Sequence, residues 1–193
     1  MKIAAIVLAA GEGQRMGGPK ALLPVGETTF LAHVCRLLER PAIAAVVAVL
    51  GAEAERVRAQ ASLPGTVTVA VNERWQDGML SSVWRGLDVA EALDVDAVLL
   101  HPVDNPLVTA ATVEAVLGAL AGGALVAVPS HAGRRGHPTG FSRVTWPALR
   151  AAPLERGARF VIASNPAWVV HVPAGPDCLA DIDTPADRRL LRG

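Results

Sequence analysis

The sequence predicts an α/β fold, with one domain over residues 1–193 in which a mostly parallel sheet carries helices on both faces. Short apolar segments of strand length alternate with helix-length segments along the whole chain, which is the order typical of strand–helix–strand units. The 193 residues match the ~100–200 residues of an ordinary domain, and no linker or repeat divides them. Ligands of such sheets bind beyond the carboxyl ends of the strands, so residues that follow expected strands are the first candidates for a site.

In the first half of the chain, the apolar run from Ile3 to Leu8 ends at a glycine-rich segment, as a strand buried on both faces does. Thr29 is expected to cap a helix that ends before Pro41, and Ser81 or Ser82 is expected to cap a later one. The expected elements are, in order, a strand at 3–8, a helix at 30–39, a strand at 44–50, a helix at 53–60, a strand at 67–71 and a helix from 81 or 82 to 91.

The second half continues the alternation. Asp104 is expected just past the carboxyl end of a strand, on the ligand edge of the sheet. Thr184 is expected to cap a last helix, with Pro185 at its first position and Asp187 in its first turn. The expected elements are a strand at 97–100, a helix at 109–120, a strand at 125–128, a loop at 130–139, a helix at 157–164, a strand at 168–172 and the helix that Thr184 caps.

Composition narrows the function class. The 18 basic and 18 acidic residues give a net charge of zero, which argues against a nucleic-acid binder because such a protein needs a basic face. The longest apolar stretch, Ala42 to Leu50, is far shorter than the ~20 residues of a membrane span. The start of the chain lacks the pattern of a secretory signal, and Cys35 and Cys178 have no metal-type spacing. We therefore expect free thiols and a cytoplasmic protein.

The glycine-rich segment at 8–20 fits neither of the two best-known nucleotide motifs. The dinucleotide fingerprint has two residues between its second and third glycines, whereas Gly13 and Gly17 enclose three. The Walker pattern places lysine directly after a glycine, whereas Pro19 separates Gly18 from Lys20. What remains is a loop whose glycines let backbone N–H groups wrap an anion. Arg15 and Lys20 would offset triphosphate charge, although a tight turn with solvated charges is the plain alternative.

Lys20 stands out because it and Lys2 are the only lysines, all other basic side chains except histidine being arginine. A site that needs a compact ammonium rather than a planar guanidinium keeps lysine under such a bias. The sequence thus favours Lys20 as a phosphate ligand.

Ordered motifs extend this pattern along the chain. They are Leu8-Ala9-Ala10-Gly11 with Arg15-Met16-Gly17, Pro19-Lys20 and Leu22-Leu23-Pro24; Asn72 to Met79 with Ser81-Ser82; His101 to Val108; Gly133 to Pro138; Gly157-Ala158-Arg159; and Asp181 to Pro185. Together they resemble the MobA-like nucleotidyltransferases, and within these they are most similar to the molybdenum cofactor cytidylyltransferases. Within this resemblance, Ala10 favours cytidine as the base, because the related guanylyltransferases typically have glycine at that position. Asn105 is a departure, since the family usually has methionine or glutamine there. The resemblance implies a three-layer Rossmann-like domain of the nucleotide-diphospho-sugar transferase type.

The resemblance also implies an activity, a metal and partners. The activity is transfer of a nucleoside monophosphate from a nucleoside triphosphate, CTP being favoured, to a phosphorylated small molecule such as molybdopterin, with release of pyrophosphate. Mg²⁺ is the implied cofactor, held by Asp104 and Asp183, with Asp181 as the alternative second ligand. A transient contact with a molybdoenzyme or its chaperone is the implied protein partnership.

We assign site residues on this basis. The catalytic residues are Arg15, Lys20 and Asp104; the nucleotide-binding residues are Leu8, Ala9, Ala10, Gly11, Gly13, Arg15, Lys20, Asn72, Gly78 and Ser81; and the acceptor-binding residues are Arg134, Arg135 and His137. Trp75 and Met79 are expected either to line the cleft or to pack in the core. His101 is expected to be a buried structural histidine.

Several alternatives stay open at this point. Asp104 before Asn-Pro is also a turn former, and Asp183 is also a helix-capping acid. The functional rivals are a transferase of the same fold that uses GTP or a sugar or isoprenoid phosphate, a dinucleotide-dependent oxidoreductase, and a non-catalytic nucleotide-binding protein. The absence of tyrosine removes the tyrosine acid of short-chain dehydrogenases.

Overall fold

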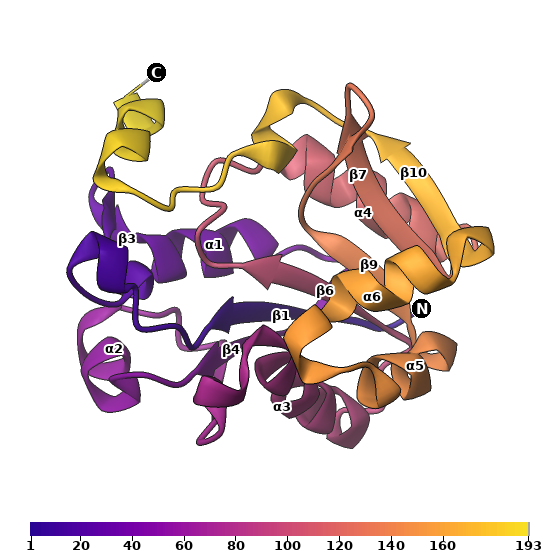
Figure 1. The fold of residues 1–193 in the computed structure, drawn as a ribbon, viewed down its shortest axis with the longest axis horizontal. Helices are drawn as coiled ribbons and strands as arrows, with labels where there is room; N and C mark the ends of the chain where they lie inside the picture. The colour runs from indigo at the N-terminus through magenta and orange to yellow at the C-terminus, as the bar shows by residue number, and fades with distance from the viewer. Residues whose placement is uncertain (193) are drawn as a thin grey trace.

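An eight-stranded sheet forms the middle layer of the computed structural model, which describes residues 1–192 (Figure 1). The strand order is β10-β7-β9-β6-β1-β4-β5, and β8 pairs with β7. Parallel pairs join β1 to β4 and β6, β4 to β5, and β7 to β10, whereas β9 is antiparallel to both β6 and β7. The bounds are β1 Ile3–Ala9, β4 Ile43–Leu50, β5 Thr68–Val71, β6 Ala97–Pro102, β7 Val126–His131, β8 Arg134–Arg135, β9 Thr139–Ser142 and β10 Val169–Pro173. A separate small sheet pairs β2 (Pro24–Val25) with β3 (Thr28–Thr29).

Helices cover both faces of the large sheet, which confirms the expected three-layer α/β fold. One apolar core joins the sheet to α1 (Phe30–Leu38), α2 (Ala54–Gln60) and α4 (Ala110–Ala121). The other joins it to α3 (Met79–Ala92), α5 (Trp146–Ala151) and α6 (Ala158–Ser164). Alternate residues of β1 enter the two cores, Ala5 and Val7 the first, Ala4 and Ile6 the second, because successive side chains of a strand point to opposite faces.

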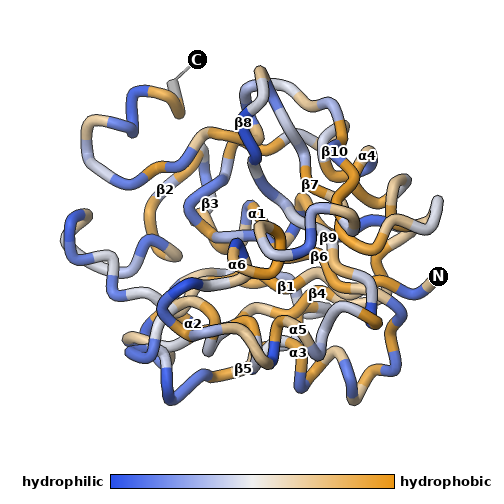
Figure 2. The backbone as a smooth tube through the Cα atoms, turned by 45° about the vertical axis from the view of Figure 1, so that its right-hand side comes forward, coloured by the Kyte–Doolittle hydropathy of each residue, from blue (hydrophilic) through white to orange (hydrophobic). Residues whose placement is uncertain are grey.

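The hydrophobic residues concentrate on the central strands, as the tube in Figure 2 shows along β1, β4 and β6. The cores tolerate no extra atoms where α3 crosses β1, since a Cβ on Gly86 would lie 2.5 Å from Ile6 Cγ2. Within residues 1–192, no helix combines the length and the apolar character that crossing a bilayer requires. Both cysteines, Cys35 and Cys178, are buried free thiols, as expected.

The segment from 130 to 142 differs from the expected loop. Strand β7 continues to His131 and turns back into β8, and β9 then inserts between β6 and β7. The short β9 was not predicted because it contains Gly140, and glycine is uncommon in strands. The structure requires glycine there, since a Cβ at position 140 would lie 2.7 Å from Leu120 Cδ1. Helix α5 was not expected either; Pro147 lies in its first turn.

The expected cap of the third helix was wrong. Helix α3 begins at Met79 with Gly78 as its N-cap, in a backbone conformation of positive φ (102°). Ser81 and Ser82 therefore lie inside the first turn, and their hydroxyls face inward and are buried. A 3-10 turn at Trp75–Asp77 delivers the chain to Gly78, which explains why the helix starts earlier than the serines suggest.

The expected cap of α1 is confirmed, because the side chain of Thr29 accepts from the backbone N–H three residues on. Thr109, expected as the start of a helix, caps α4 in the same way. At the C-terminal end, Pro185–Arg192 forms a 3-10 helix rather than an α-helix. There Asp187 is the capping side chain, since its carboxylate accepts from the backbone N–H of Asp183 and Thr184.

Candidate active site

The loop that follows β1 is folded back on itself by its glycines. Gly13 and Gly17 both have left-handed backbone conformations, with φ of 64° and 77°, which glycine adopts without steric cost. A side chain at position 13 is impossible, because its Cβ would lie 2.1 Å from the carbonyl oxygen of Gly18. The backbone N–H of Met16 donates to Gly13 O at 2.8 Å. The loop therefore presents its backbone at the carboxyl end of β1.

Lys20 joins this loop to two carboxylates that are distant in the sequence. Its Nζ donates to Asp104 Oδ2 at 2.8 Å and also to Asp183 Oδ1. Partial burial alone would lower the pKa of Lys20, but hydrogen bonds and the charges of the two aspartates outweigh it and raise the pKa above its ordinary value. The ammonium is thus fully charged at neutral pH and lies between the two predicted metal ligands.

Backbone pairing selects Asp183 over Asp181 for this position. Asp104 follows β6, and its carbonyl oxygen accepts from the backbone N–H of Ile182 at 2.8 Å. The side chain of Ile182 is fully buried, so it anchors the C-terminal segment to the end of β6. Asp183 contacts Lys20, whereas Asp181 accepts from Asn105 Nδ2. In Figure 1 this segment, in yellow, crosses the end of the sheet toward which β1 and β6 point.

The donor set at Asp104 and Asp183 fits a hard divalent cation. Both are carboxylates, which Mg²⁺ and Mn²⁺ prefer, and Mg²⁺ in nucleotide sites commonly uses one or two carboxylates together with water and phosphate oxygens. Within residues 1–192 no cluster of three or more histidine, cysteine, aspartate or glutamate side chains is suited to hold a metal by itself. Water molecules, or the phosphate oxygens of a bound nucleotide, would complete the coordination of such a metal.

A cavity of about 350 Å³ lies between the glycine-rich loop and the start of α3. Its lining contains most of the predicted nucleotide-binding residues, namely Leu8, Ala9, Ala10, Gly11, Gly13, Lys20 and Gly78, together with Asp104. Trp75 and Met79, for which the sequence left two interpretations, line it as well, and so do the unassigned Gln76, Ser82 and Val103. Arg15 lines an adjoining opening with Lys20, Trp75 and Asp183. We call the first cavity the loop cavity.

Two predicted nucleotide ligands lie behind the wall of the loop cavity. The Asn72 side chain is buried, and its Nδ2 donates to the hydroxyls of Ser81 and Ser82 at 2.8 and 3.0 Å. Its Oδ1 accepts from the backbone N–H of Arg74 at 3.0 Å, and Ser81 Oγ donates to Gly78 O at 2.7 Å. Through these hydrogen bonds, Asn72 and Ser81 stabilise the turn before α3. Neither side chain lines the loop cavity, so their direct contact with a nucleotide stays a prediction.

A second cavity, of about 460 Å³, shares a wall with the first. Leu8, Gly78, Met79 and Pro102 line both. The remaining walls are largely apolar and come from β6, β9, α3 and α6, with His137 among them. Met79 is 60% exposed, as expected of a residue at a shared mouth. We call this space the apolar cavity.

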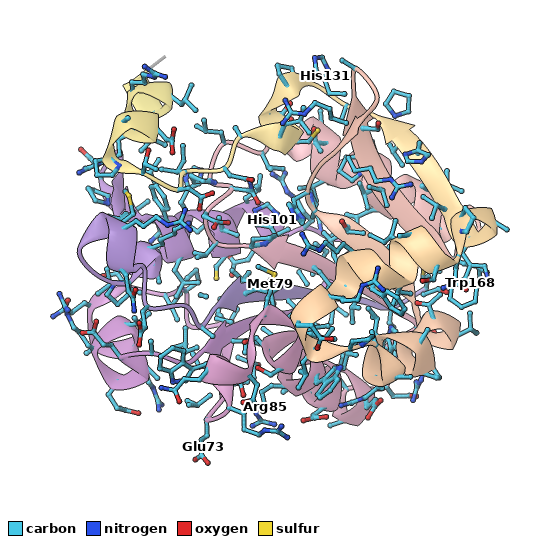
Figure 3. All side chains as sticks on the ribbon, in the orientation of Figure 1. Glu73, Met79, Arg85, His101, His131 and Trp168 are labelled. Atoms are coloured by element: carbon cyan, nitrogen blue, oxygen red, sulfur yellow. The ribbon has the colours of Figure 1, made fainter. Side chains whose placement is uncertain are left out.

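The predicted acceptor residues separate in the structure. His137 lines the apolar cavity, but Arg134 and Arg135 are exposed on β8 and line neither cavity. Arg134 pairs with His131 across the hairpin, and Figure 3 shows His131 at the upper edge of the molecule, far from the central Met79. Burial lowers the pKa of His137, and the nearby charges of Asp181 and Asp104 offset this only in part. The ring is therefore neutral at neutral pH.

His101 is a buried structural histidine in β6, as expected. Its Nε2 lies 3.2 Å from Asn105 O, and within residues 1–192 its Nδ1 has no hydrogen-bond partner. Burial lowers the pKa of His101 to about 3, with further contributions from the nearby His137 and His33.

This pKa predicts a measurable acid sensitivity. The unfolded state binds a proton at His101 below pH ~6.5, whereas the folded state does not until about pH 3. Unfolding therefore becomes easier as the pH falls, by about 2 kcal/mol between pH 7 and pH 5 for this group. We expect His101→Gln to lose that part of the pH dependence in urea unfolding. His171→Gln, at an exposed histidine of β10, is the control and should keep it; an unchanged slope in His101→Gln would contradict the assignment.

Comparison with known proteins agrees with the class of site that the fold and loop define, a nucleoside triphosphate site at the carboxyl edge of an α/β sheet. The chain belongs to the MobA-like NTP transferase family, whose domain matches residues 5–169. It is 30% identical to the molybdenum cofactor guanylyltransferase of Rhodobacter capsulatus, over 97% of this chain and 93% of that protein. It is 34% identical to the nicotine blue oxidoreductase of Paenarthrobacter nicotinovorans, over 88% and 85% of the two chains.

Other relatives share only part of their length with this protein. The bifunctional enzyme IspD/IspF of Rhizorhabdus wittichii is 39% identical over 62% of this chain, but the match spans only 31% of that enzyme.

Among solved structures, Rv0371c of Mycobacterium tuberculosis H37Rv superposes with a TM-score of 0.83 at 28% identity, covering all of both chains. A complex of Rv0371c with manganese superposes with a TM-score of 0.72 at 27% identity, over 99% of this chain and 98% of that one. The protein is therefore a nucleotidyltransferase of the MobA and IspD type.

Proposed function

We propose that this protein transfers a cytidine monophosphate from CTP to the phosphate of molybdopterin or of its molybdenum-bound form, with Mg²⁺ as the metal. The observation that carries the proposal is the meeting of Lys20 with Asp104 and Asp183, where the loop cavity joins the adjoining opening that Arg15 lines. This arrangement places a phosphate-binding cation and two hard oxygen donors beside a glycine-rich loop, which is what a metal-bound triphosphate requires.

The proposed chemistry is one displacement at phosphorus. An oxygen of the acceptor's phosphate attacks the α-phosphorus of the nucleotide, a new P–O bond forms, and the bond from the α-phosphorus to the bridging oxygen breaks. Pyrophosphate leaves with that oxygen and its electron pair. The nucleophile is already anionic near neutral pH, so no protein base has to remove a proton. Rate enhancement then comes from positioning and from charge stabilisation.

The residues divide this work by their location. The backbone of Gly11 and Gly13 cradles the phosphates at the end of β1, and Lys20 supplies a positive charge beside them. Arg15, in the adjoining opening, meets the departing pyrophosphate. Asp104 and Asp183 would hold the divalent cation, which when bound neutralises the triphosphate and polarises its oxygens.

The choice of base is proposed to depend on Ala10. Ala10 is buried at the end of β1 and lines the loop cavity. Its methyl group lies against the backbone of Gly51. A Cβ added to Gly51 would lie 2.7 Å from the Cβ of Ala10 and 2.6 Å from the Cβ of Trp75. There is thus little space to move the methyl aside for a purine. One methyl contact discriminates by ~1–3 kcal/mol, so we expect a CTP preference of about tenfold that Ala10→Gly relaxes toward GTP.

Competition between CTP and GTP, with molybdopterin as acceptor and pyrophosphate release as the readout, measures this preference. Gly118→Ala, in helix α4 with open space around the added methyl group and outside both cavities, serves as the control. A GTP preference in the unmodified protein would contradict the Ala10 argument but leave the transferase proposal intact.

The transferase proposal itself is tested by supplying each nucleoside triphosphate with Mg²⁺ and molybdopterin. The expected result is pyrophosphate release that depends on the acceptor and the metal, together with a cytidylylated product identified by mass spectrometry. Release with a sugar phosphate or an isoprenoid precursor phosphate, and not with molybdopterin, would move the protein to another acceptor. We also propose that the activity resides in a single domain over 1–193 and in the cytoplasm, where transient contact delivers the product to a molybdoenzyme or its chaperone.

A second function is favoured by one specific relative. The nicotine blue oxidoreductase is 34% identical to this protein along most of both chains. A relative of this protein is therefore named as an oxidoreductase. The corresponding candidate here is reduction of an organic molecule, with a nicotinamide dinucleotide in the loop cavity. Oxidation of NADH or NADPH, followed at 340 nm with quinonoid dyes as acceptors, tests it. Turnover there together with no pyrophosphate release from any triphosphate would favour the oxidoreductase.

A further inference from the structure

Two contacts join the C-terminal segment to the end of β6, next to the proposed metal ligands. One is the backbone hydrogen bond in which Ile182 N–H donates to Asp104 O. The other joins side chains, because Asn105 Nδ2 donates to Asp181 Oδ1. The two contacts involve successive residues on both segments. Together they hold the C-terminal segment in one register just before it reaches Asp183.

The side chain of Asn105 is fully buried, whereas Asp181 is exposed. A carboxylate only accepts hydrogen bonds, so the amide nitrogen of Asn105 has to face Asp181. Among the described residues, Asn105 Oδ1 accepts from no donor. Within residues 1–192 this side chain therefore makes one hydrogen bond, and a buried amide nitrogen that lost it would be left without a partner, at a cost in free energy. The contact with Asp181 is the one that the burial of Asn105 favours.

The backbone of Asn105 is held as well. Its carbonyl oxygen accepts from His101 Nε2 at 3.2 Å, and its N–H donates to Pro102 O at 3.3 Å. Figure 3 shows His101 near the middle of the molecule. A side chain whose backbone is fixed in the core can hold a more exposed partner in place. Asn105 is thus the fixed end of the contact, and the position of Asp181 depends on it.

We propose that Asn105 is a positioning residue for the divalent metal, because its bond to Asp181 holds Asp183 in place as a ligand. This rests on the proposed function, in which Asp104 and Asp183 hold the metal. Lys20 bridges these two carboxylates, so they lie close enough to share one cation. Asp181 is then an anchor and not a ligand. Loss of either partner of the anchoring bond lets the segment around Asp183 move and weakens the metal site.

Binding of Mn²⁺ to the nucleotide-free protein, followed by electron paramagnetic resonance of the free ion, tests this without turnover. Asn105→Leu removes the amide and leaves every charge in place, whereas Asp181→Ala removes the other partner from an exposed position. We expect each change to weaken Mn²⁺ binding about tenfold, the usual effect of losing a residue that orients a metal ligand. The double variant should bind Mn²⁺ no more weakly than Asp181→Ala alone, because both changes break the same bond.

Asp181→Asn separates an anchor from a ligand. Its amide oxygen can still accept from Asn105, so Mn²⁺ binding should weaken by no more than about threefold, through the lost charge alone. Equal weakening in Asp181→Asn and Asp181→Ala would make Asp181 a ligand and overturn the proposal. Unchanged or tighter binding in Asn105→Leu, or no Mn²⁺ binding by the unmodified protein, would also overturn it. If Asn105→Leu does not fold, the two variants of the exposed Asp181 carry the same test.

Asn165→Leu is the matched control. Asn165 Nδ2 donates to Val161 O at 2.9 Å at the end of α6, and the residue lines neither cavity. This variant also loses an amide hydrogen bond, but far from the carboxylates, so its Mn²⁺ affinity should equal that of the unmodified protein. An equal loss of affinity in Asn165→Leu and Asn105→Leu would show a general effect of destabilisation and overturn the proposal.

Turnover supplies a second readout. In Asn105→Leu the Mg²⁺ concentration for half-maximal rate should rise about tenfold, while kcat at saturating Mg²⁺ changes by less than about threefold. A fall in kcat that Mg²⁺ does not restore would contradict a positioning role. Failure of the transferase proposal is seen differently, as absence of pyrophosphate release by the unmodified protein, and it leaves the Mn²⁺ measurements valid.

Discussion

Asp104→Asn is expected to lower kcat/KM for pyrophosphate release by at least about 100-fold, which corresponds to about 2.7 kcal/mol of transition-state stabilisation. The substitution keeps the size of the side chain but removes the negative charge that faces Lys20 and the proposed metal. The carbonyl oxygen of Asp104, which anchors Ile182, is untouched. We therefore expect the urea midpoint to stay close to that of the unmodified protein while the Mg²⁺ concentration needed for half-maximal rate rises.

The design of this experiment separates a site role from a structural one. Asp94→Asn removes a carboxylate of another ion pair, the one with Arg143 at the opposite end of β6, and should change neither rate nor metal requirement. Asp183→Asn should act in the same direction as Asp104→Asn but more mildly, because the side chain of Asp183 is 47% exposed and that of Asp104 only 24%. Loss of folded protein in Asp104→Asn, with normal activity in the remaining folded fraction, would make Asp104 a structural residue.

Lys20→Met is expected to reduce turnover by at least tenfold, and more if the ammonium contacts the phosphates in the transition state. The same change should have an opposite effect on metal binding to the nucleotide-free protein. The Lys20 ammonium now lies between Asp104 and Asp183, where it competes with a cation for both carboxylates. Without it, Mn²⁺ should bind roughly tenfold more tightly, a gain of about 1.4 kcal/mol.

Electron paramagnetic resonance of free Mn²⁺ measures this affinity without any turnover. Lys2→Met is a matched control, because Lys2 is the only other lysine and lies exposed at the opposite end of β1. Lys20→Arg should recover part of the rate, since it restores the charge with a different geometry. Normal turnover in Lys20→Met would contradict the phosphate role, and unchanged or weaker Mn²⁺ binding would contradict the competition with the metal.

Local sequence patterns were sufficient for the layers of the fold and for the position of the loop. The continuous apolar run of β1 indicated burial on both faces, and Thr29 and Thr109 marked helix starts through hydrogen bonds that span only three residues. The spacing of Gly13, Gly17 and Lys20 was enough to exclude the two familiar nucleotide motifs. These features depend on neighbours along the chain, so the chain itself reveals them.

Contacts between distant segments were beyond such patterns. Ser81 and Ser82 looked like caps, yet Asn72 and a preceding 3-10 turn draw them inside the helix. The strand β9 was missed because its glycine is explained only by Leu120 on a helix packed over it. In each case a tertiary partner overrode a local preference.

The site divides in the same way. The sequence by itself determined that a glycine-rich loop with Lys20 follows the first strand. It also gave Asp104, Asp181 and Asp183 as the candidate metal ligands. Only the tertiary structure showed which of Asp181 and Asp183 meets Lys20, because the hydrogen bond from the backbone N–H of Ile182 to the carbonyl oxygen of Asp104 fixes the path of the C-terminal segment. It also placed Arg134 and Arg135 on an exposed hairpin, outside both cavities. A cavity is enclosed by residues that lie far apart in the sequence and that folding brings together. Their spacing along the chain therefore does not predict which of them line it.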